Sequence, residues 1–278
     1  MHAGLLRSKI LGNLMKILNG EILLNKKYGE KLYKMEIFSP YICKNALPGQ
    51  FVNIKCCYEG MLDPLLRRPL GIYEIDKRFN VFSILYLVKG KGTLFLSKLK
   101  KGEILNFIGP LGNAIKIEAE TENYLLVGGG IGVAPLCLIA RYLADLQKNV
   151  YFIAGFKDEL FFSWESDLMK IVKNYRIFTE NGSFGERGLP TNFIREHIDQ
   201  YKKFNFICCG PREMLKTLQD ILQDKNISAI ALMEETMACG IGACMGCIIK
   251  IKEASNAFTY KRVCSDGPAF NLMEVIFD

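Results

Sequence analysis

Residues 124–136 read YLLVGGGIGVAPL, an apolar run followed by a glycine-rich turn and a second apolar run. The uncharged stretch from Tyr124 to Ala140 approaches the length of a membrane span. The glycines and Pro135 in this stretch argue against a membrane-spanning helix, because a helix exposed to lipid needs continuous backbone hydrogen bonding. The pattern instead predicts a strand, a tight turn and a helix, the repeating unit of a parallel sheet covered by helices. No membrane association is expected.

The turn in this segment departs from the G-x-G-x-x-G fingerprint, and Pro135 falls in the first turn of the following helix. Backbone amides and the positive end of a helix at such a turn can receive a phosphate. We therefore predict a nucleotide contact at Gly128, Gly129, Gly130 and Gly132. A tight turn with a purely structural role is the alternative.

Strand and helix patterns continue to alternate after this turn. The segment FNFICCGPREML, residues 204–215, places Cys209, Gly210 and Pro211 at the carboxyl end of a strand. Open α/β sheets bind their ligands at that end of the strands. These three residues are predicted cofactor contacts; Cys209 could face a nicotinamide, and an inert core thiol is the alternative for it.

The first part of the chain has a different sequence pattern: short alternating or apolar runs are separated by turns rich in Pro, Gly and Asn. Such runs predict a small antiparallel barrel. LLRRPLGIYEI, residues 65–75, leads from two arginines into an apolar strand. Arg67 or Arg68 could clamp a pyrophosphate, because guanidinium matches phosphate oxygens in a fork. An arginine pair on the surface of an edge strand is the alternative.

Four cysteines near the end of the chain follow the pattern C-x4-C-x2-C-x16-C: Cys239, Cys244, Cys247 and Cys264. The spacing resembles the ligand run of a plant-type ferredoxin and predicts a [2Fe-2S] cluster, which carries single electrons. The glycines between them let a loop wrap the cluster and aim backbone N–H groups at its sulfurs. A zinc site and unligated core cysteines are the alternatives.

The chain has 278 residues, half of them hydrophobic, and a formal net charge of +7. This length allows two ordinary domains and a small appendage. The basic residues are scattered, so a solvated surface explains them best and no nucleic-acid partner is expected. Lysines interrupt the apolar N-terminus, so the ten cysteines follow no recognisable secretion signal. A reducing, cytoplasmic setting is therefore predicted.

The order of RRPLG, VGGGIGVAPL and CGPREML resembles the ferredoxin-reductase superfamily of flavin and nicotinamide reductases. The tail, EETMACGIGACMGC followed by RVCSDGPAF, resembles the electron-transfer subunits of class 1B dihydroorotate dehydrogenases. The resemblance implies an FAD-binding barrel at residues 14–117, an NAD-binding α/β domain at 123–226 and a [2Fe-2S] domain at 227–278. Residues 1–13 have no counterpart and are expected to be disordered or a start-site artefact. The third domain is too short for a large core, so we expect the cluster to organise it.

The resemblance also implies individual contacts. The implied FAD contacts are Arg68, Pro69, Leu70, Gly71, Leu85, Tyr86, Leu87, Gly92 and Thr93, and the four cysteines would ligate the cluster. Three positions depart from the family pattern: many members have serine at Gly71, a basic residue at Thr236 and aspartate at Asn181. These departures affect details of cofactor electronics or docking rather than the identity of the cofactors.

By this resemblance the chain passes electrons from the FMN of a catalytic subunit, which oxidises dihydroorotate to orotate, through [2Fe-2S] and FAD to NAD. FAD is needed because NAD exchanges two electrons as hydride and the cluster carries one. A heterotetramer with two subunits of each kind is implied. One alternative is a related reductase subunit of a hydrogenase, sulfite reductase or transhydrogenase. Another is a zinc-stabilised nucleotide-binding module without redox activity.

No acid–base catalyst is predicted. The histidines are His2 and His197, and a surface or capping role explains His197 better than catalysis. Glu234 and Glu235 beside the cysteines could tune the cluster or meet the partner. The segment KDE at residues 157–159 follows a strand of the sheet, and its carboxylates favour the ribose 2′-OH of NAD over the 2′-phosphate of NADP.

Overall fold

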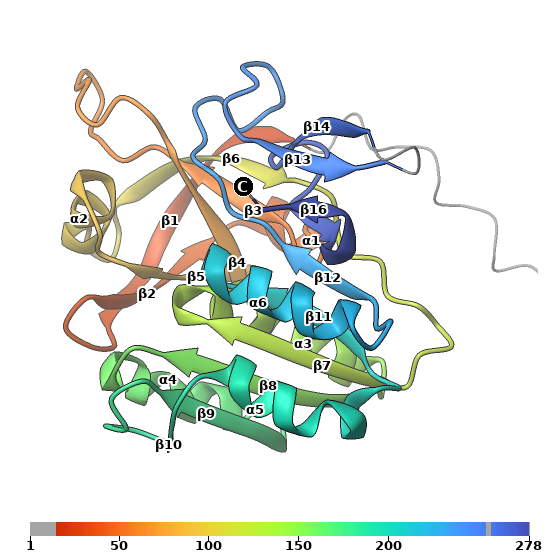
Figure 1. Ribbon diagram of the computed structural model, residues 1–278. Coiled ribbons are helices and arrows are strands. Elements are labelled where there is room, and N and C mark those ends of the chain that lie inside the picture. Colours follow the sequence, from red (N-terminus) through yellow and green to blue (C-terminus); the bar gives the residue numbers. More distant parts are fainter. Residues whose placement is uncertain (1–14, 254–256, 278) are drawn as a thin grey trace, which may run out of the picture.

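The computed structural model describes residues 15–253 and 257–277. The predicted leader, residues 1–13, lies outside this part. The described strands form a closed barrel, a seven-stranded sheet and a three-stranded sheet. Figure 1 shows the barrel in red to yellow, with the C-terminal three-stranded sheet in dark blue. No helix of the described residues is long and apolar enough to cross a membrane.

The barrel is built from the first six strands. Its elements are β1 (Lys16–Lys27), β2 (Leu32–Phe38), α1 (Pro40–Asn45), β3 (Phe51–Ile54), β4 (Arg68–Asp76), β5 (Val81–Leu87), α2 (Lys91–Lys98) and β6 (Ile104–Leu111). The strands close in the order β1-β2-β5-β4-β3-β6, and every pair is antiparallel. Side chains such as Ile37, Ile84 and Phe107 fill the interior, as alternation along each strand requires. The predicted antiparallel barrel is confirmed.

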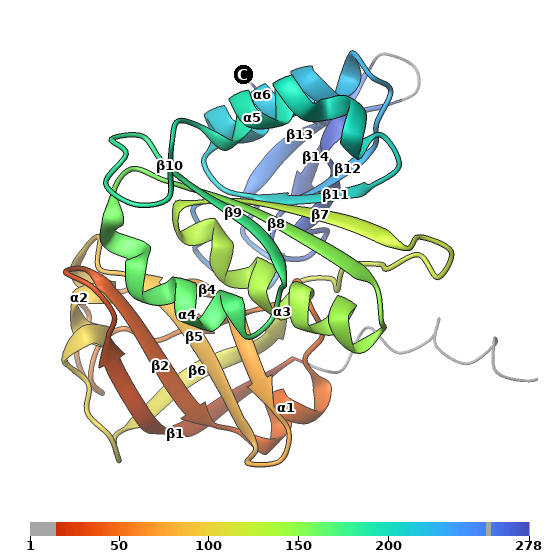
Figure 2. The same cartoon turned by 90° about the horizontal axis from the view of Figure 1, so that it is seen from below.

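The seven-stranded sheet follows in sequence. Its elements are β7 (Asn123–Gly129), η1 (Gly130–Gly132), α3 (Val133–Asp145), β8 (Asn149–Phe156), η2 (Glu159–Phe161), α4 (Phe162–Met169), β9 (Asn174–Thr179), β10 (Glu186–Arg187), α5 (Pro190–His197), η3 (Ile198–Tyr201), β11 (Asn205–Cys209), α6 (Arg212–Gln223), β12 (Ala229–Leu232) and β15 (Ala269–Asn271). The strand order is β10-β9-β8-β7-β11-β12-β15. All neighbours are parallel except β12 and β15. Helices α3 and α4 cover the face toward the barrel, and α5 and α6 cover the other (Figure 2). The predicted parallel sheet is confirmed.

The strand order places a topological switch between β7 and β11. The chain moves outward from β7 to β10 and then returns to the opposite side of β7. Crossover connections therefore diverge at the carboxyl ends of β7 and β11, and such a crevice is where open α/β sheets bind ligands. The glycine-rich turn and the Cys209 segment both lie at this edge.

The C-terminal sheet consists of β14 (Phe258–Arg262), β13 (Ile248–Lys252) and β16 (Val275–Ile276), in that order, with η4 (Leu272–Glu274) before β16. Its buried side chains Ile249, Ile251 and Val275 belong to the same hydrophobic core as Leu218 and Ile221 of α6. The same stretch of chain also supplies β12 and β15 to the seven-stranded sheet. Packing on the α/β core therefore anchors this segment, in addition to any cluster that it binds.

Polar side chains join the barrel to the α/β part. Asp167 on α4 accepts hydrogen bonds from the hydroxyls of Tyr28 and Tyr73, each over 3.2 Å. Lys34 Nζ lies 3.1 Å from Glu74 Oε2 and 3.8 Å from Asp167 Oδ2. Lys34 and Asp167 are both buried, and besides partners on their own sides, Glu74 and Lys170, each has an opposite charge across the interface. This interdomain polar cluster fixes how the barrel sits against α4.

Candidate functional site

A cleft of about 450 Å³ opens where three parts of the chain meet. The barrel contributes the start of β4 and the end of β5, the α/β part contributes the start of α3, and residues 232–237 close the third side. Gly71 lets β4 and α3 approach, because a Cβ at this position would lie 3.2 Å from the Cβ of Pro135. A smaller pocket of about 350 Å³ between residues 115–119 and the end of α3 contains none of the predicted site residues.

The cleft gathers eight of the nine predicted FAD contacts: Arg68, Pro69, Leu70, Gly71, Leu85, Tyr86, Leu87 and Thr93. The ninth, Gly92, is buried at the start of α2, where a Cβ would lie 2.9 Å from the Arg68 Nε. A side chain at that position would displace the Arg68 side chain, which occupies the space. The structure thus brings the set together, and the contact of each residue with FAD stays a prediction.

The two adjacent arginines have different surroundings. Arg67 donates from Nη1 to the Asn53 carbonyl over 3.3 Å and from Nη2 to Asn106 Oδ1 over 2.6 Å, which ties β3 to β6. Arg68 donates from Nη1 to the carbonyl of Leu66 over 2.6 Å, and its side chain borders the cleft. Arg67 is therefore a structural residue, and Arg68 is the arginine placed to meet a phosphate.

The start of α2 confirms the position of the predicted glycine loop at the cleft and adds Lys89, a cationic side chain that the sequence prediction did not name. The Thr93 hydroxyl oxygen accepts hydrogen bonds from the main-chain N–H groups of Lys89, over 2.9 Å, and Gly90, over 3.3 Å. Lys89 and Gly90 line the cleft with Arg68. The signal was present as KGKGT, residues 89–93, directly after a predicted strand. A helix start beside two cationic side chains is suited to a diphosphate.

The glycine-rich turn is held closely against the segment after β11. Gly128 pairs in register with Cys209. A Cβ at Gly132 would lie 2.5 Å from the Cys209 carbonyl oxygen, and one at Gly129 would lie 2.7 Å from Pro211. Gly130 alone of these turn glycines faces open space, with a φ of +53°. Close packing thus accounts for the other glycines, and a phosphate contact at this turn stays a prediction.

Within the described residues, the wall of the cleft includes Cys209 but not Gly210 or Pro211. Cys209 Sγ lies 4.0 Å from Glu234 Oε1. Burial, followed by the charge of Glu234, raises the pKa of the Cys209 thiol well above its ordinary value, so the thiol is protonated. Glu234 keeps an exposed surface in the cleft, yet protein atoms surround its carboxyl group and raise its pKa against the opposing effect of Lys89. The sequence pattern places Glu234 beside the cysteines but gives no signal for its position in the cleft.

The four predicted cluster ligands lie on one loop and one turn. The loop before β13 carries Cys239, Cys244 and Cys247, and the turn after β14 carries Cys264. The thiols of Cys239 and Cys244 are hydrogen-bonded to each other, as are those of Cys247 and Cys264. Each of the four sulfurs also accepts a main-chain N–H over 3.1 to 3.4 Å. The loop thus directs its amides at the sulfurs, as the glycine content predicts.

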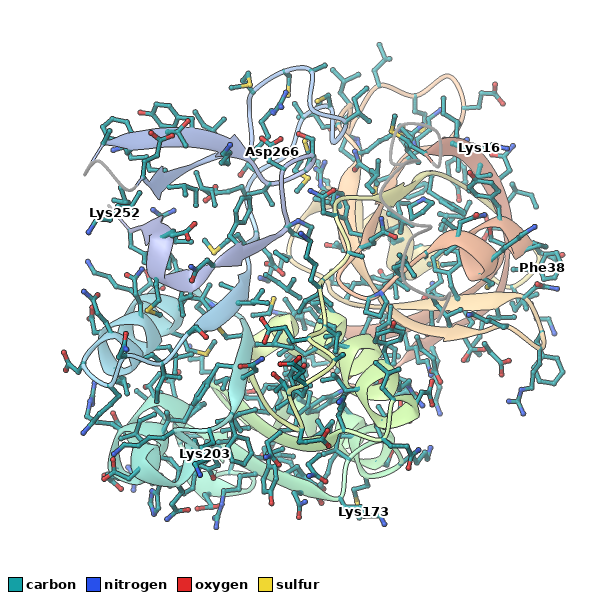
Figure 3. All side chains as sticks on the ribbon, turned by 90° about the vertical axis from the view of Figure 1, so that its right-hand side faces the viewer. Lys16, Phe38, Lys173, Lys203, Lys252 and Asp266 are labelled. Atoms are coloured by element: carbon teal, nitrogen blue, oxygen red, sulfur yellow. The ribbon has the colours of Figure 1, made fainter. Side chains whose placement is uncertain are left out.

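Arg262 and Asp266 hold the loop and the turn together. Arg262 donates from its main-chain N–H to Asp266 Oδ2 over 2.8 Å and from Nη1 to the Gly242 carbonyl over 2.9 Å. Asp266 lies in the blue C-terminal segment at the top of the molecule, where Figure 3 labels it. Because one arginine bonds both Gly242 of the loop and Asp266 of the turn, the two halves of the ligand set keep a fixed spacing.

The donor set fits a two-iron cluster. Burial raises the pKa of Cys239, but hydrogen bonds from the Ile241 N–H and from Cys244 outweigh burial and lower the pKa to about 6, which favours the ligating thiolate. A [2Fe-2S] core takes two protein sulfurs at each iron, and the sulfurs form two such pairs, Cys239 with Cys244 and Cys247 with Cys264.

Comparison with known proteins identifies the family. The model described as "Iron-sulfur cluster binding domain of dihydroorotate dehydrogenase B" matches residues 234–276. The "Dihydroorotate dehydrogenase B (NAD(+)), electron transfer subunit" of Caldanaerobacter subterraneus subsp. tengcongensis is 38% identical over 261 residues, which are 94% of this chain and 98% of that protein. This chain belongs to that family. Another dihydroorotate dehydrogenase B electron transfer subunit, from Bacillus cereus (strain Q1), is 36% identical over 95% of this chain and 100% of its own.

Solved structures agree with this placement. An NADH-dependent reduced ferredoxin-NADP oxidoreductase superposes with a TM-score of 0.78 at 29% identity, covering 92% of this chain and 89% of that one. A phthalate dioxygenase reductase superposes with a TM-score of 0.59 at 17% identity, covering 88% and 76%, which shows the shared fold. The family name implies a catalytic subunit of dihydroorotate dehydrogenase B as partner.

These comparisons confirm the prediction of an electron-transfer subunit of an oxidoreductase complex. The predicted cofactors, FAD, [2Fe-2S] and NAD, agree with the cluster-binding domain and the reductase fold. The alternative of a zinc-stabilised module without redox activity finds no support in the family. The hydrogenase, sulfite reductase and transhydrogenase alternatives share the fold, but the relatives that match nearly the whole chain carry the dihydroorotate dehydrogenase name.

Proposed function

We propose that this chain receives electrons from the FMN of a dihydroorotate-oxidising catalytic subunit at a [2Fe-2S] cluster and delivers them through FAD to NAD. The cluster would be held by Cys239, Cys244, Cys247 and Cys264, and FAD would occupy the cleft. When bound, FAD would link the two-electron chemistry of NAD to the one-electron chemistry of the cluster.

The observation that carries this proposal is the shared wall between the two sites. Met237 lines the cleft and lies two residues before Cys239. Asn53, on the barrel strand β3, donates from Nδ2 to the Cys239 carbonyl over 3.3 Å. One short segment thus borders both the predicted flavin site and the predicted cluster, and the barrel fixes its position.

The chain's own residues divide the work of holding the cofactors. Arg68 and Lys89, with the start of α2, would neutralise the FAD diphosphate. Leu85 and Leu87 on β5 and Pro135 on α3 offer apolar surface for the flavin ring. The Cys209 thiol, kept protonated by burial, would pack against the nicotinamide without acting as a nucleophile.

The finer assignments belong to the same proposal. Gly128, Gly129, Gly130, Gly132, Gly210 and Pro211 would approach the nucleotide at the switch between β7 and β11. The assembly would be a cytoplasmic heterotetramer with two copies of each subunit. None of the ten cysteines, all of them among the described residues, forms a disulfide bond, which suits a reducing compartment.

Anaerobic reconstitution tests the function. The chain, loaded with iron, sulfide and FAD, is mixed with the catalytic subunit encoded in the same genome, and NAD reduction by dihydroorotate is followed. Flavin and cluster absorption bands that bleach with NADH, together with NADH production from dihydroorotate, are expected. A colourless protein with stoichiometric zinc contradicts the redox role. A coloured complex in which dihydroorotate reduces nothing contradicts the pyrimidine assignment alone.

A further inference from the structure

Exposed apolar side chains gather on the loop between β3 and β4. Five of the nine positions from 58 to 66 are exposed large apolar residues: Tyr58, Met61, Leu62, Leu65 and Leu66. Single exposed apolar residues are common on any protein, but a run of them forms a patch, and patches mark interaction surfaces. Tyrosine and methionine are also enriched in protein interfaces.

This loop is held in a defined shape. The Met61 N–H donates to the Tyr58 carbonyl over 3.2 Å, and the Cys57 thiol donates to the Met61 carbonyl over 3.3 Å. The Tyr58 ring meets Phe95 of α2 edge-on, with 4.9 Å between ring centroids. The leucines are thus presented to solvent by an ordered turn, a preorganisation that lowers the entropic cost of binding.

The cysteine loop extends the same surface. Ile241 and Met245 are exposed, and between them lies Cys244, the exposed member of the predicted ligand set. The cysteine loop and the β3–β4 loop project side by side from the same end of the molecule (Figures 1 and 3). The hydrogen bond from Asn53 to the Cys239 carbonyl joins their bases. The two loops therefore present exposed apolar side chains at the same end of the molecule, beside the exposed cluster ligand Cys244.

The size of this face matches half of a protein interface. Exposed fractions run from 43% at Leu66 to 77% at Leu62. With about 180 Å² for a fully exposed residue of this size, the seven side chains expose roughly 700 Å², above the few hundred expected on a monomer and near the roughly 800 Å² that each partner gives to a standard interface. The exposed ion pair between Asp63 and Lys91, at 2.6 Å, supplies a polar group in the same loop.

We propose that Tyr58, Met61, Leu62, Leu65, Leu66, Ile241 and Met245, the docking patch, are the surface on which the dihydroorotate-oxidising catalytic subunit binds. This inference rests on the proposed function. Electrons pass between protein-bound centres only over short distances, so the partner must cover the exposed edge of the cluster site. Cys244 lies within the patch at that edge, and the apolar surface around it excludes water when the partner docks.

A charge-insertion pair tests the patch in the full-length chain loaded with FAD and cluster. Leu62→Asp with Leu65→Asp places two carboxylates in the proposed interface centre. The matched control is Phe79→Asp with Met169→Asp, at two residues that are similarly exposed but lie on the β4–β5 turn and at the end of α4. Binding to the catalytic subunit is measured by calorimetry, and NADH-driven reduction of ferricyanide reports the intact flavin site.

The patch variant is expected to raise the dissociation constant at least tenfold and to lower dihydroorotate-dependent NAD reduction, with ferricyanide reduction unchanged. The control is expected to bind as the unaltered chain does. Equal binding by both variants shows that the docking patch is not the binding surface for the catalytic subunit, and it leaves the proposed function unaffected. An unaltered chain that fails to bind the catalytic subunit overturns both. A homodimer of this chain that the patch variant dissociates assigns the surface to a second copy and also overturns the proposal.

A photo-crosslinking residue at Leu65 keeps the test valid if the double variant folds poorly. A covalent adduct with the catalytic subunit is expected from position 65, and none from position 79. Adducts from both positions or from position 79 alone contradict the docking patch.

Discussion

Asn53 of the barrel donates a hydrogen bond from Nδ2 to the main-chain carbonyl of Cys239, across 3.3 Å. Its side chain is fully buried, and its Oδ1 has no hydrogen-bond partner among the described residues. A Cβ at Gly240 would run into the Nδ2 of this asparagine. The Asn53 side chain thus holds the cysteine loop against the barrel. The loop can approach Asn53 this closely because Gly240, the residue after Cys239, has no side chain.

Replacement of Asn53 by alanine should loosen this contact. We expect the free energy of unfolding to fall by about 1 to 2 kcal/mol, the cost of losing a buried hydrogen bond. The iron content relative to flavin should fall as well, because the loop that carries Cys239 loses its support. Thermal melts and iron analysis measure both effects. Asn174→Ala, at an exposed position on β9, should change neither. Full iron content in Asn53→Ala would contradict the positioning role.

Replacement of Cys247 by serine should separate the two redox sites. We expect the cluster to be lost while FAD binding and NADH-driven flavin reduction stay within about twofold, because the cleft is lined by other residues. Electron flow to the partner should fall to background. Cys43→Ser, at a buried thiol on α1 far along the chain from the cluster, should retain the cluster. Equal loss of all activities in Cys247→Ser would instead show that the cluster is needed for folding.

The carboxyl group of Glu234 should make stability depend on pH. Burial raises its pKa above the ordinary 4.5, so the folded chain holds this proton more tightly than the unfolded chain. The stability that the protonated Glu234 carboxyl contributes to the folded state is therefore fully present below pH 4.5. It is lost as the pH rises through the folded-state pKa. Glu234→Gln should remove that loss, so its melting temperature should exceed that of the unaltered chain increasingly as the pH rises from 4.5. A difference that is constant with pH, or that Glu120→Gln reproduces, would contradict the assignment.

Removal of the Asp167 carboxylate should weaken the junction between the barrel and α4. It receives the hydroxyls of Tyr28 and Tyr73 and lies 3.8 Å from the buried Lys34. Asp167→Ala should destabilise the protein by about 3 kcal/mol, because the lysine then loses one of its partners in a buried setting. Asp145→Ala, exposed at the end of α3, should cost less than about 0.5 kcal/mol. Denaturant titration measures the free energy of unfolding of both variants. An equal loss in the two variants would contradict the stabilising role of the interdomain polar cluster.

The prediction from sequence was strongest where residues must lie close along the chain. The spacing of Cys239, Cys244 and Cys247 and the turn after β7 are local patterns, and local backbone rules fix what such patterns build. The arginine pair shows the limit of that reasoning. The sequence does not distinguish Arg67 from Arg68. Only the tertiary structure shows that Arg67 bonds Asn106 of a neighbouring strand, whereas Arg68 lines the cleft.

The amino-acid sequence by itself determined the barrel, the parallel sheet and the four-cysteine loop, because periodicity, glycine placement and ligand spacing act over a few residues at a time. Tertiary structure decided the rest. It placed Glu234 and Lys89 in one cleft, paired Cys247 with Cys264 across sixteen intervening residues, and set Asn53 beneath Cys239. These relationships join segments far apart in the chain, and packing of the shared cores, rather than local preference, brings such segments together.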